Sequence, residues 1–184
     1  MKADFRVVLD ACVLANFGVC DLLLRLAERP RLYLPCWSEA ILDETRRTQG
    51  GALGWPMPLV ESFKTALKSA FPEALVEDYE HLAAQCTNDP KDRHVLACAI
   101  HCKAEVILTF NLADFPAEAL APWRVAALHP QDYLLTLFVL EPLHVMHQLG
   151  GIAQKRRCTI EDHLINLGRF LPEFSSRVLE GLNA

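Results

Sequence analysis

Short apolar runs alternate with longer segments of helical spacing along the first 130 residues of the chain. FRVVLD (5–10), LYLPC (32–36) and EVILTF (105–110) are short and almost entirely apolar before they end in polar residues or loops. This pattern is typical of strands that are buried on both faces of a sheet. RVAAL (124–128) predicts a further strand, and LVEDY near residue 75 another short one.

Between these runs, apolar residues recur every three or four positions, which indicates amphipathic helices. The predicted helices span residues 14–28, 37–47, 59–70 and 89–102. Ser38 is the expected N-cap of the second helix. Residues 48–58 hold three of the eight glycines and two prolines, and we expect a loop there. Strands and helices that alternate in this way predict an α/β fold with three layers, in which helices flank both faces of a parallel sheet.

The chain changes character after residue 130, where helical patterns continue and no strand follows. We therefore divide it into a domain over residues 1–130 and a helical extension over residues 131–184. Gly150, Gly151 and the basic run 155–157 are expected to interrupt the extension, before two helices over 159–167 and 172–182. We expect the extension to cover one edge of the sheet or to bind a partner.

Composition narrows the class of protein. A chain of 184 residues with 52% hydrophobic content can bury one full-sized core. Its net charge of -5 argues against a protein that binds nucleic acid through a strongly basic surface, but not against an enzyme that binds nucleic acid through metal ions. The first ten residues do not resemble a signal peptide, and no apolar run approaches the roughly 18 residues of a membrane span. We expect a cytoplasmic protein without a membrane segment.

The seven cysteines are an odd number and show no repeated C-x-x-C spacing. Most are expected to be buried thiols in a reducing compartment. Cys98, His101 and Cys102 lie about one helical turn apart, a spacing that could belong to a zinc site. Because no second pair of ligands matches them, core packing is the favoured interpretation.

Acidic residues stand at the ends of the predicted strands. Asp10 ends the first strand, Asp114 follows EVILTF, and Asp92 opens the helix that leads into that strand. In open α/β sheets, ligands bind at the carboxyl ends of the strands. Glu44 lies near the end of its own helix, from which a long side chain reaches the same rim. Four carboxylates from distant positions in the sequence are therefore expected to meet in one pocket.

Crowded carboxylates repel one another unless a cation compensates their charge. An all-oxygen ligand set without paired His or Cys favours a hard ion, either Mg²⁺ or Mn²⁺. Such a site suits the attack of water on a phosphodiester, because the ion activates the water and neutralises the leaving oxygen. The acids thus point to metal-dependent hydrolysis of a phosphodiester.

Asp89 and Asp92 also have a purely structural interpretation. Asp89 could be the N-cap of the helix, with Pro90 at its first position and Asp92 as the acid of a capping box. Glu44 could likewise be an ordinary solvated helix acid. We favour Asp92 as a metal ligand, because an isolated capping pair would not predict matching acids after two strands.

Four segments together resemble the PIN-domain family, in particular its VapC-type toxin branch. They are VVLDACVL (7–14), ILDETRR (41–47), DPKDRHVLACAI (89–100) and VILTFNLADFP (106–116). Each motif alone is weak, but four in the right order are a strong signal. The resemblance spans roughly residues 5–130 and implies the catalytic acids Asp10, Glu44, Asp92 and Asp114. It makes Asp10, Asp92 and Asp114 metal ligands, with Glu44 a ligand or bound through water, and assigns supporting roles to Asp89, Thr109 and Asn111.

The resemblance implies an endoribonuclease that uses Mg²⁺ or Mn²⁺ to cut single-stranded or loop RNA. It further implies a toxin that a cognate antitoxin protein neutralises, and members of the family often form homodimers. Arg46, Arg47 and Arg93 are candidates for phosphate contacts because of their positions. Cys12 departs from the Asn, Ser or Thr of many relatives and is expected to remove a hydrogen bond from the metal site.

Several other functions compete with this one. An aspartyl phosphatase normally carries a second Asp two residues after the first, where this chain has Cys12. A nucleotide-binding protein needs a glycine-rich turn after the first strand, which DACVLANFG does not supply. A catalytically impaired PIN fold that only binds RNA or protein stays open, with metal binding without turnover as its signature. His94 is expected to be structural or to contact substrate rather than to act as a general base.

Overall fold

The computed structural model describes residues 5–182 of the chain. Its sheet contains β1 (Arg6–Leu9), β2 (Leu34–Cys36), β3 (Val106–Leu108) and β4 (Ala126–Leu128). The strands lie in the order β2-β1-β3-β4, and each neighbouring pair is parallel. The four strands predicted from the longest apolar runs are thereby confirmed. The run near residue 75 is not part of this sheet, because Leu75 makes only an isolated bridge to Trp37.

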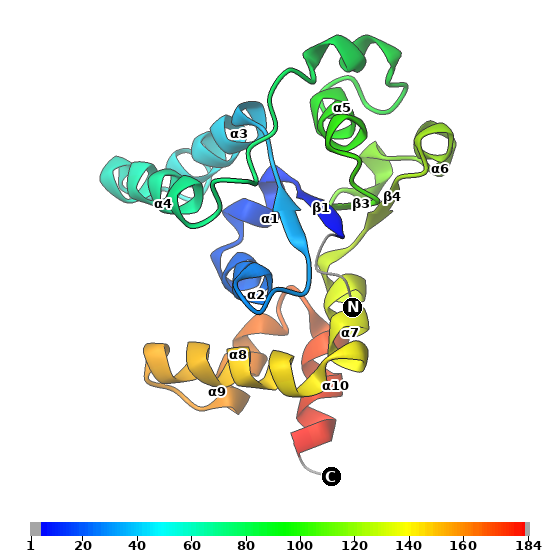
Figure 1. Ribbon diagram of the computed structural model, residues 1–184. Helices are drawn as coiled ribbons and strands as arrows, with labels where there is room; N and C mark the ends of the chain where they lie inside the picture. Colours follow the sequence, from blue (N-terminus) through cyan, green and yellow to red (C-terminus); the bar gives the residue numbers. More distant parts are fainter. Residues whose placement is uncertain (1–4, 183–184) are drawn as a thin grey trace.

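Helices cover both faces of this sheet, as the alternating sequence pattern predicts (Figure 1). The α5 helix (Arg93–Cys102) packs on β1 and β3, and the 3-10 helix η1 (Glu80–Gln85) packs against α5. The opposite face carries α1 (Ala11–Ala15) and α2 (Phe17–Ala27). The three-layer α/β prediction is confirmed.

The helix predicted over residues 14–28 is in fact two helices. Asn16 ends α1 and then caps α2, because its side chain accepts a hydrogen bond from the backbone N–H of Val19. Asparagine is favoured at the N-cap because its side-chain oxygen accepts a hydrogen bond from a backbone N–H that has no partner within the helix. The break lets the chain leave β1 through the short α1 before it turns into α2.

Two further helices stand beside this core. In α3 (Glu39–Gly50), the Ser38 side chain accepts from the backbone N–H of Ile41, so the predicted N-cap is confirmed. The helix continues past residue 47 to Gly50, and the expected loop shrinks to the residues before α4 (Met57–Ala70). The short elements η2 (Leu112–Asp114), α6 (Ala117–Leu120) and η3 (Ala121–Trp123) connect β3 to β4.

The extension consists of α7 (Pro130–Leu140), α8 (Pro142–Arg156), α9 (Ile160–Leu167) and α10 (Pro172–Leu182). The two last helices were correctly predicted, but the expected interruption at Gly150 and Gly151 is wrong, since α8 runs through both. Glycine costs about 1 kcal/mol in a helix interior. Burial of Val145, Leu149 and Ile152 along α8 outweighs that cost.

The extension packs against α2 through α8. That it covers an edge of the sheet or binds a partner stays a prediction. The Arg156 Nη2 atom of α8 lies 3.2 Å from Asp21 Oδ2 of α2. The guanidinium of the same arginine lies over the ring of Phe17. The hydrophobic core is continuous, since buried residues of the extension such as Leu134 and Phe174 belong to the same cluster as the strands.

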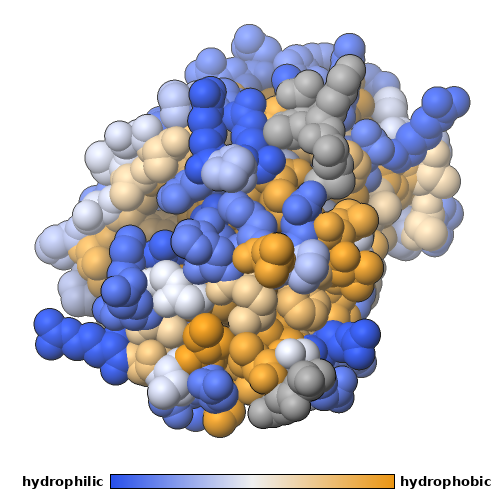
Figure 2. Space-filling view, turned by 60° about the horizontal axis from the view of Figure 1, so that its bottom comes forward, coloured by the Kyte–Doolittle hydropathy of each residue, from blue (hydrophilic) through white to orange (hydrophobic). Residues whose placement is uncertain are grey.

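The end of the molecule formed by the extension carries hydrophobic side chains on its surface (Figure 2). Val139 and Leu143 are among the most exposed of its large apolar residues.

None of the helices within residues 5–182 combines the length and the apolar character needed to cross a membrane. Cys98 and Cys102 are buried in the core whereas His101 is exposed, as the core-packing interpretation predicts. Five of the seven cysteines are buried.

Candidate metal centre

Asp10 lies at the carboxyl end of β1 and is almost completely buried, with 3% of its surface exposed. Its Oδ1 atom accepts a hydrogen bond of 2.7 Å from the backbone N–H of Ala11. Its Oδ2 atom accepts 2.7 Å from the hydroxyl of Thr109, the residue that follows β3. The neighbouring strands β1 and β3 thus fix the orientation of this carboxylate.

Cys12 adds a third hydrogen bond to Asp10, which corrects the expectation that it would remove one. Its Sγ lies 3.2 Å from Asp10 Oδ2 and accepts 3.3 Å from the backbone N–H of Phe110. Burial, and then the charge of Asp10, raises the pKa of the Cys12 thiol to about 12. The thiol therefore stays protonated at neutral pH and donates as a serine or threonine hydroxyl would.

We expect Cys12→Ser to keep RNA cleavage within about threefold of the wild type, because the hydroxyl makes the same two contacts. Cys12→Val has a similar volume but no donor, and should lower cleavage roughly tenfold. Initial rates of both variants on one labelled RNA measure the difference. Equal rates for the two variants would show that the thiol contact with Asp10 has no role.

Asp92 stands immediately before α5, at its N-cap position, but its side chain makes no capping hydrogen bond. Asp89 is not the N-cap either, since its Oδ1 accepts from the backbone N–H of Lys91 at 2.9 Å within a turn. The capping-box interpretation of this stretch is therefore wrong. The physical reason is that Pro90 and the two residues after it form a turn, so that the helix begins only at Arg93.

Asp92 experiences the charges of all the predicted acids. Burial raises its pKa to about 7, and the charges of four carboxylates add to this rise in the order Asp10, Asp114, Glu44 and Asp89. Like charges raise the pKa of a carboxyl group in this way when they lie within several ångströms of it. The structure thus brings together the acids that the sequence separates by up to 104 positions, from Asp10 to Asp114.

Asp114 ends the 3-10 helix η2 that follows β3. Its carbonyl oxygen accepts a hydrogen bond of 3.2 Å from the backbone N–H of Asp89, which joins the two loops. Asn111 is exposed and contributes through its backbone N–H, which donates 3.0 Å to the hydroxyl of Thr109. Thr109 therefore links the backbone of Asn111 to the carboxylate of Asp10.

Glu44 reaches the rim of this cluster from α3 and meets His94 of α5. The Nε2 atom of His94 lies 3.5 Å from Glu44 Oε2. Its Nδ1 atom lies 2.9 Å from the carbonyl oxygen of Lys91. A carbonyl oxygen only accepts, so Nδ1 carries a proton. Sequence reasoning missed this contact because no local spacing relates positions 44 and 94.

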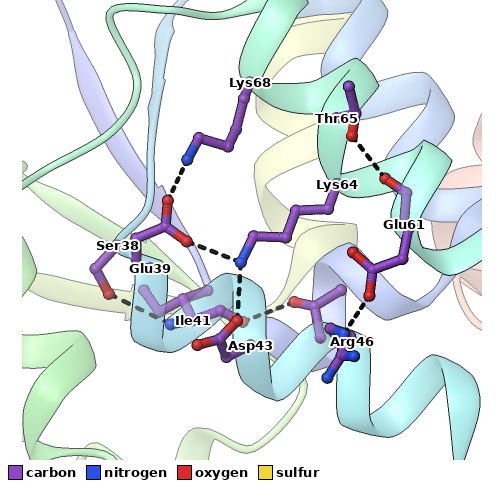
Figure 3. Close-up of polar contacts among 10 residues, drawn as sticks. Ser38, Glu39, Ile41, Asp43, Arg46, Glu61, Lys64, Thr65 and Lys68 are labelled. Atoms are coloured by element: carbon purple, nitrogen blue, oxygen red, sulfur yellow. Dashed lines mark hydrogen bonds and ion pairs between the residues drawn. The ribbon is translucent and has the colours of Figure 1, made fainter.

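The three candidate arginines lie in different surroundings. Arg46 forms an ion pair with Glu61 of α4, on the side of α3 shown in Figure 3. Arg93 donates from Nε to the carbonyl oxygen of Asn88 at 3.5 Å. Arg47 is exposed and lines a pocket beside Glu44. Of the three, Arg47 lines a pocket next to the carboxylates, whereas Arg46, paired with Glu61, does not line it and is no longer a candidate for a phosphate contact.

A comparison with known protein families identifies the family of this chain. The family model of the PIN domain matches residues 4–113. The chain belongs to the PIN-domain family. Asp10, Glu44 and Asp92 lie inside the matched segment, and Asp114 follows it directly.

A relative of this PIN domain bears the name "Putative ribonuclease VapC50" and comes from Mycobacterium tuberculosis (strain ATCC 25618 / H37Rv). The two chains are 46% identical over 89 residues, which cover 47% of this chain and 52% of the relative. The match thus spans about half the length of the relative. The similarity to this relative agrees with the resemblance to the VapC-type branch. No solved structure matched the chain significantly.

The donor set of the PIN domain fits a hard divalent ion. Asp10, Asp89, Asp92 and Asp114 form no ion pair with any lysine or arginine among residues 5–182. Within residues 5–182, no three His, Cys, Asp or Glu side chains lie close enough together to coordinate one metal ion. Repulsion between uncompensated carboxylates opposes such a close approach. Oxygen ligands with this excess of negative charge suit Mg²⁺ or Mn²⁺.

Proposed function

We propose that this PIN domain is an endoribonuclease that depends on Mg²⁺ or Mn²⁺ and hydrolyses phosphodiester bonds in single-stranded or loop RNA. The observation that carries the proposal is the half-buried Asp92, whose pKa is raised to about 7 by burial and then by the charges of four other carboxylates. Repulsion from the neighbouring carboxylates destabilises an acid that has only a structural role, whereas a bound cation would offset this repulsion. The name of the ribonuclease relative supports the choice of RNA as substrate.

Each part of the chain has a distinct task in this reaction. Asp10, Asp92 and Asp114 would hold the ion, and Glu44 would bind it directly or through water. A divalent ion bound there would lower the pKa of a water molecule and offset the charge of the scissile phosphate. Thr109 and Cys12 hold Asp10 in one orientation through their hydrogen bonds. The Asp89 turn and η2 place Asp92 and Asp114 on neighbouring loops.

The chemical ends of the products test this mechanism. Attack by water with loss of the 3′ oxygen leaves a 5′-phosphate and a 3′-hydroxyl, whereas attack by the RNA 2′-hydroxyl leaves a 2′,3′-cyclic phosphate. We expect 5′-phosphate ends from a mixed-sequence single-stranded RNA incubated with Mn²⁺. Terminal labelling of the products before and after phosphatase treatment identifies the ends. Cyclic phosphate ends that form without metal would refute the proposal.

The alternative is a catalytically impaired PIN fold that binds RNA or protein without cutting it. Its main support in the sequence is Cys12, but the thiol donates a hydrogen bond to Asp10. The full set of acids around Asp92 also favours turnover. Binding of Mn²⁺ without cleavage of any RNA would establish the alternative.

We further infer that the protein is the toxin of a toxin-antitoxin pair, with a cognate antitoxin protein as its partner. The similarity to a relative named as a VapC ribonuclease supports this role. Induced expression of the wild type alone should then arrest bacterial growth, and expression of Asp10→Asn should not. Equal growth of the two strains would count against a toxin.

A further inference from the structure

A pocket of about 490 Å³ lies directly beside the carboxylate cluster. One face of α3 lines it through Ala40, Asp43, Glu44 and Arg47, and the start of α5 lines it through Lys91 and His94. These α3 positions follow the spacing i, i+3, i+4 and i+7, so they share one face of the helix. Glu44 belongs both to this pocket and to the carboxylate cluster.

The charges around this pocket are unequally compensated. Asp43 forms an ion pair with Lys64 of α4, whose Nζ lies 2.8 Å from Asp43 Oδ1 and 2.8 Å from Glu39 Oε2 (Figure 3). Arg47 and Lys91 are exposed, and neither forms an ion pair within residues 5–182. Two free cations therefore flank a pocket in a protein whose net charge is -5.

We propose that this Arg47–Lys91 pocket binds one backbone phosphate of the RNA strand, next to the phosphate that is cut. The proposal rests on the proposed nuclease function, since it extends the same site. Arginine and lysine are the side chains that contact nucleic-acid phosphates most often, and they set the register of the strand without reading its bases. The pocket would therefore position RNA and leave the chemical step to the carboxylates.

His94 connects this pocket to the carboxylates. Through Nδ1 it donates to the carbonyl oxygen of Lys91, which holds the turn that carries the lysine. Through Nε2 it faces Glu44 at 3.5 Å. His94 thus joins the turn that carries Lys91 to Glu44, the residue that the pocket shares with the carboxylate cluster.

A second pocket limits the subsite to one phosphate. This pocket, of about 640 Å³, also borders Ala40, Asp43 and His94, and its lining includes the acids Glu77, Asp78 and Glu80. Glu77, Asp78 and Glu80 form no ion pair in the described part of the chain. Their charge repels phosphate, so a strand leaving the Arg47–Lys91 pocket turns toward solvent instead of following this groove.

Charge-neutral variants of Arg47 and Lys91 test the subsite, with Arg46→Gln as the matched control. Arg46 precedes Arg47 on the same helix and loses the same charge on substitution, but it is paired with Glu61 outside the pocket. We expect Arg47→Gln and Lys91→Gln each to raise KM for a mixed-sequence 12-nucleotide RNA roughly three- to tenfold with little change in kcat. Each should also flatten the dependence of log(kcat/KM) on log[NaCl] by about 0.7, the value for one phosphate contact of a single strand. Arg46→Gln should change neither.

Fluorescence anisotropy with the same labelled RNA separates a failure of the subsite from a failure of the nuclease. If the wild type cleaves RNA and the Arg47 and Lys91 variants behave like Arg46→Gln, the subsite is refuted and the nuclease stands. If the wild type binds RNA without cutting it, and the two variants weaken binding while Arg46→Gln does not, the subsite stands and the nuclease fails. Absence of both binding and cleavage in the wild type would overturn both.

Discussion

Asp10→Asn is expected to abolish RNA cleavage, lowering kcat/KM by at least about a thousandfold while the protein stays folded. The substitution removes one negative charge but keeps an oxygen that can accept from the backbone N–H of Ala11. The amide that replaces Oδ2 can donate to the Thr109 hydroxyl and to the Cys12 sulfur, which then accept instead of donating. The loss should therefore appear in cleavage and metal binding rather than in the circular dichroism spectrum.

The control for this variant is Asp132→Asn, which removes the same charge from an exposed position on α7, in the extension. It should cleave RNA at the wild-type rate. Full activity in Asp10→Asn would show that the residue at the end of β1 holds no part of the reaction. Equal losses in both variants would point to net charge instead of to the site.

Asp92→Asn should leave the melting temperature of the metal-free protein unchanged or raise it, and should remove the stabilisation that Mn²⁺ gives to the wild type. The variant removes a partly buried charge and its repulsion by Asp10, Asp114, Glu44 and Asp89, the two causes that raise the pKa of Asp92 to about 7. A ligand that binds only the folded state raises the melting temperature, so the loss of the ion's site cancels that shift. Differential scanning fluorimetry with and without Mn²⁺ measures both effects.

The same residue predicts how the stability of the metal-free protein depends on pH. Because the folded-state pKa of Asp92 lies above its usual value of 3.8, its contribution to stability is complete below pH 4 and is lost as the pH rises toward 7. Asp92 is partly exposed, so solvent screening reduces this loss to about 1–2 kcal/mol. Asp92→Asn should lose less stability than the wild type between pH 4 and pH 7. A large destabilisation of the metal-free variant at all pH values would instead restore a structural role for this carboxylate.

The strands and the set of acids were predictable because each depends on a local signal. A strand buried on both faces must be apolar throughout, and β1 and β3 show this directly in FRVVLD and EVILTF. The carboxyl ends of parallel strands meet at one edge, so Asp10 and the residues after β3 had to approach one another. The N-cap at Ser38 could be predicted for the same reason, since capping involves only residues of one turn.

Other features depend on contacts between distant parts of the chain and could not be predicted. The role of Cys12 requires knowing that Thr109 and Phe110 lie beside it, 97 and 98 positions later. The contact between Glu44 and His94 joins two helices that lie far apart in the sequence and share no local pattern. The continuity of α8 through Gly150 and Gly151 follows from its packing on α2, which outweighs the poor helix propensity of glycine. Tertiary contacts in these places override the local pattern.

Reversal of chelation tests most directly whether the carboxylates around Asp92 form a metal-dependent nuclease centre. A labelled single-stranded RNA pool is incubated with the wild type and Mn²⁺, an excess of chelator is added midway, and an excess of Mn²⁺ is added afterwards. Cleavage should stop on chelation and resume when Mn²⁺ is restored, while Asp10→Asn stays inactive throughout. Cleavage that continues at the same rate in chelator, or that persists in Asp10→Asn, would contradict a metal centre at these residues.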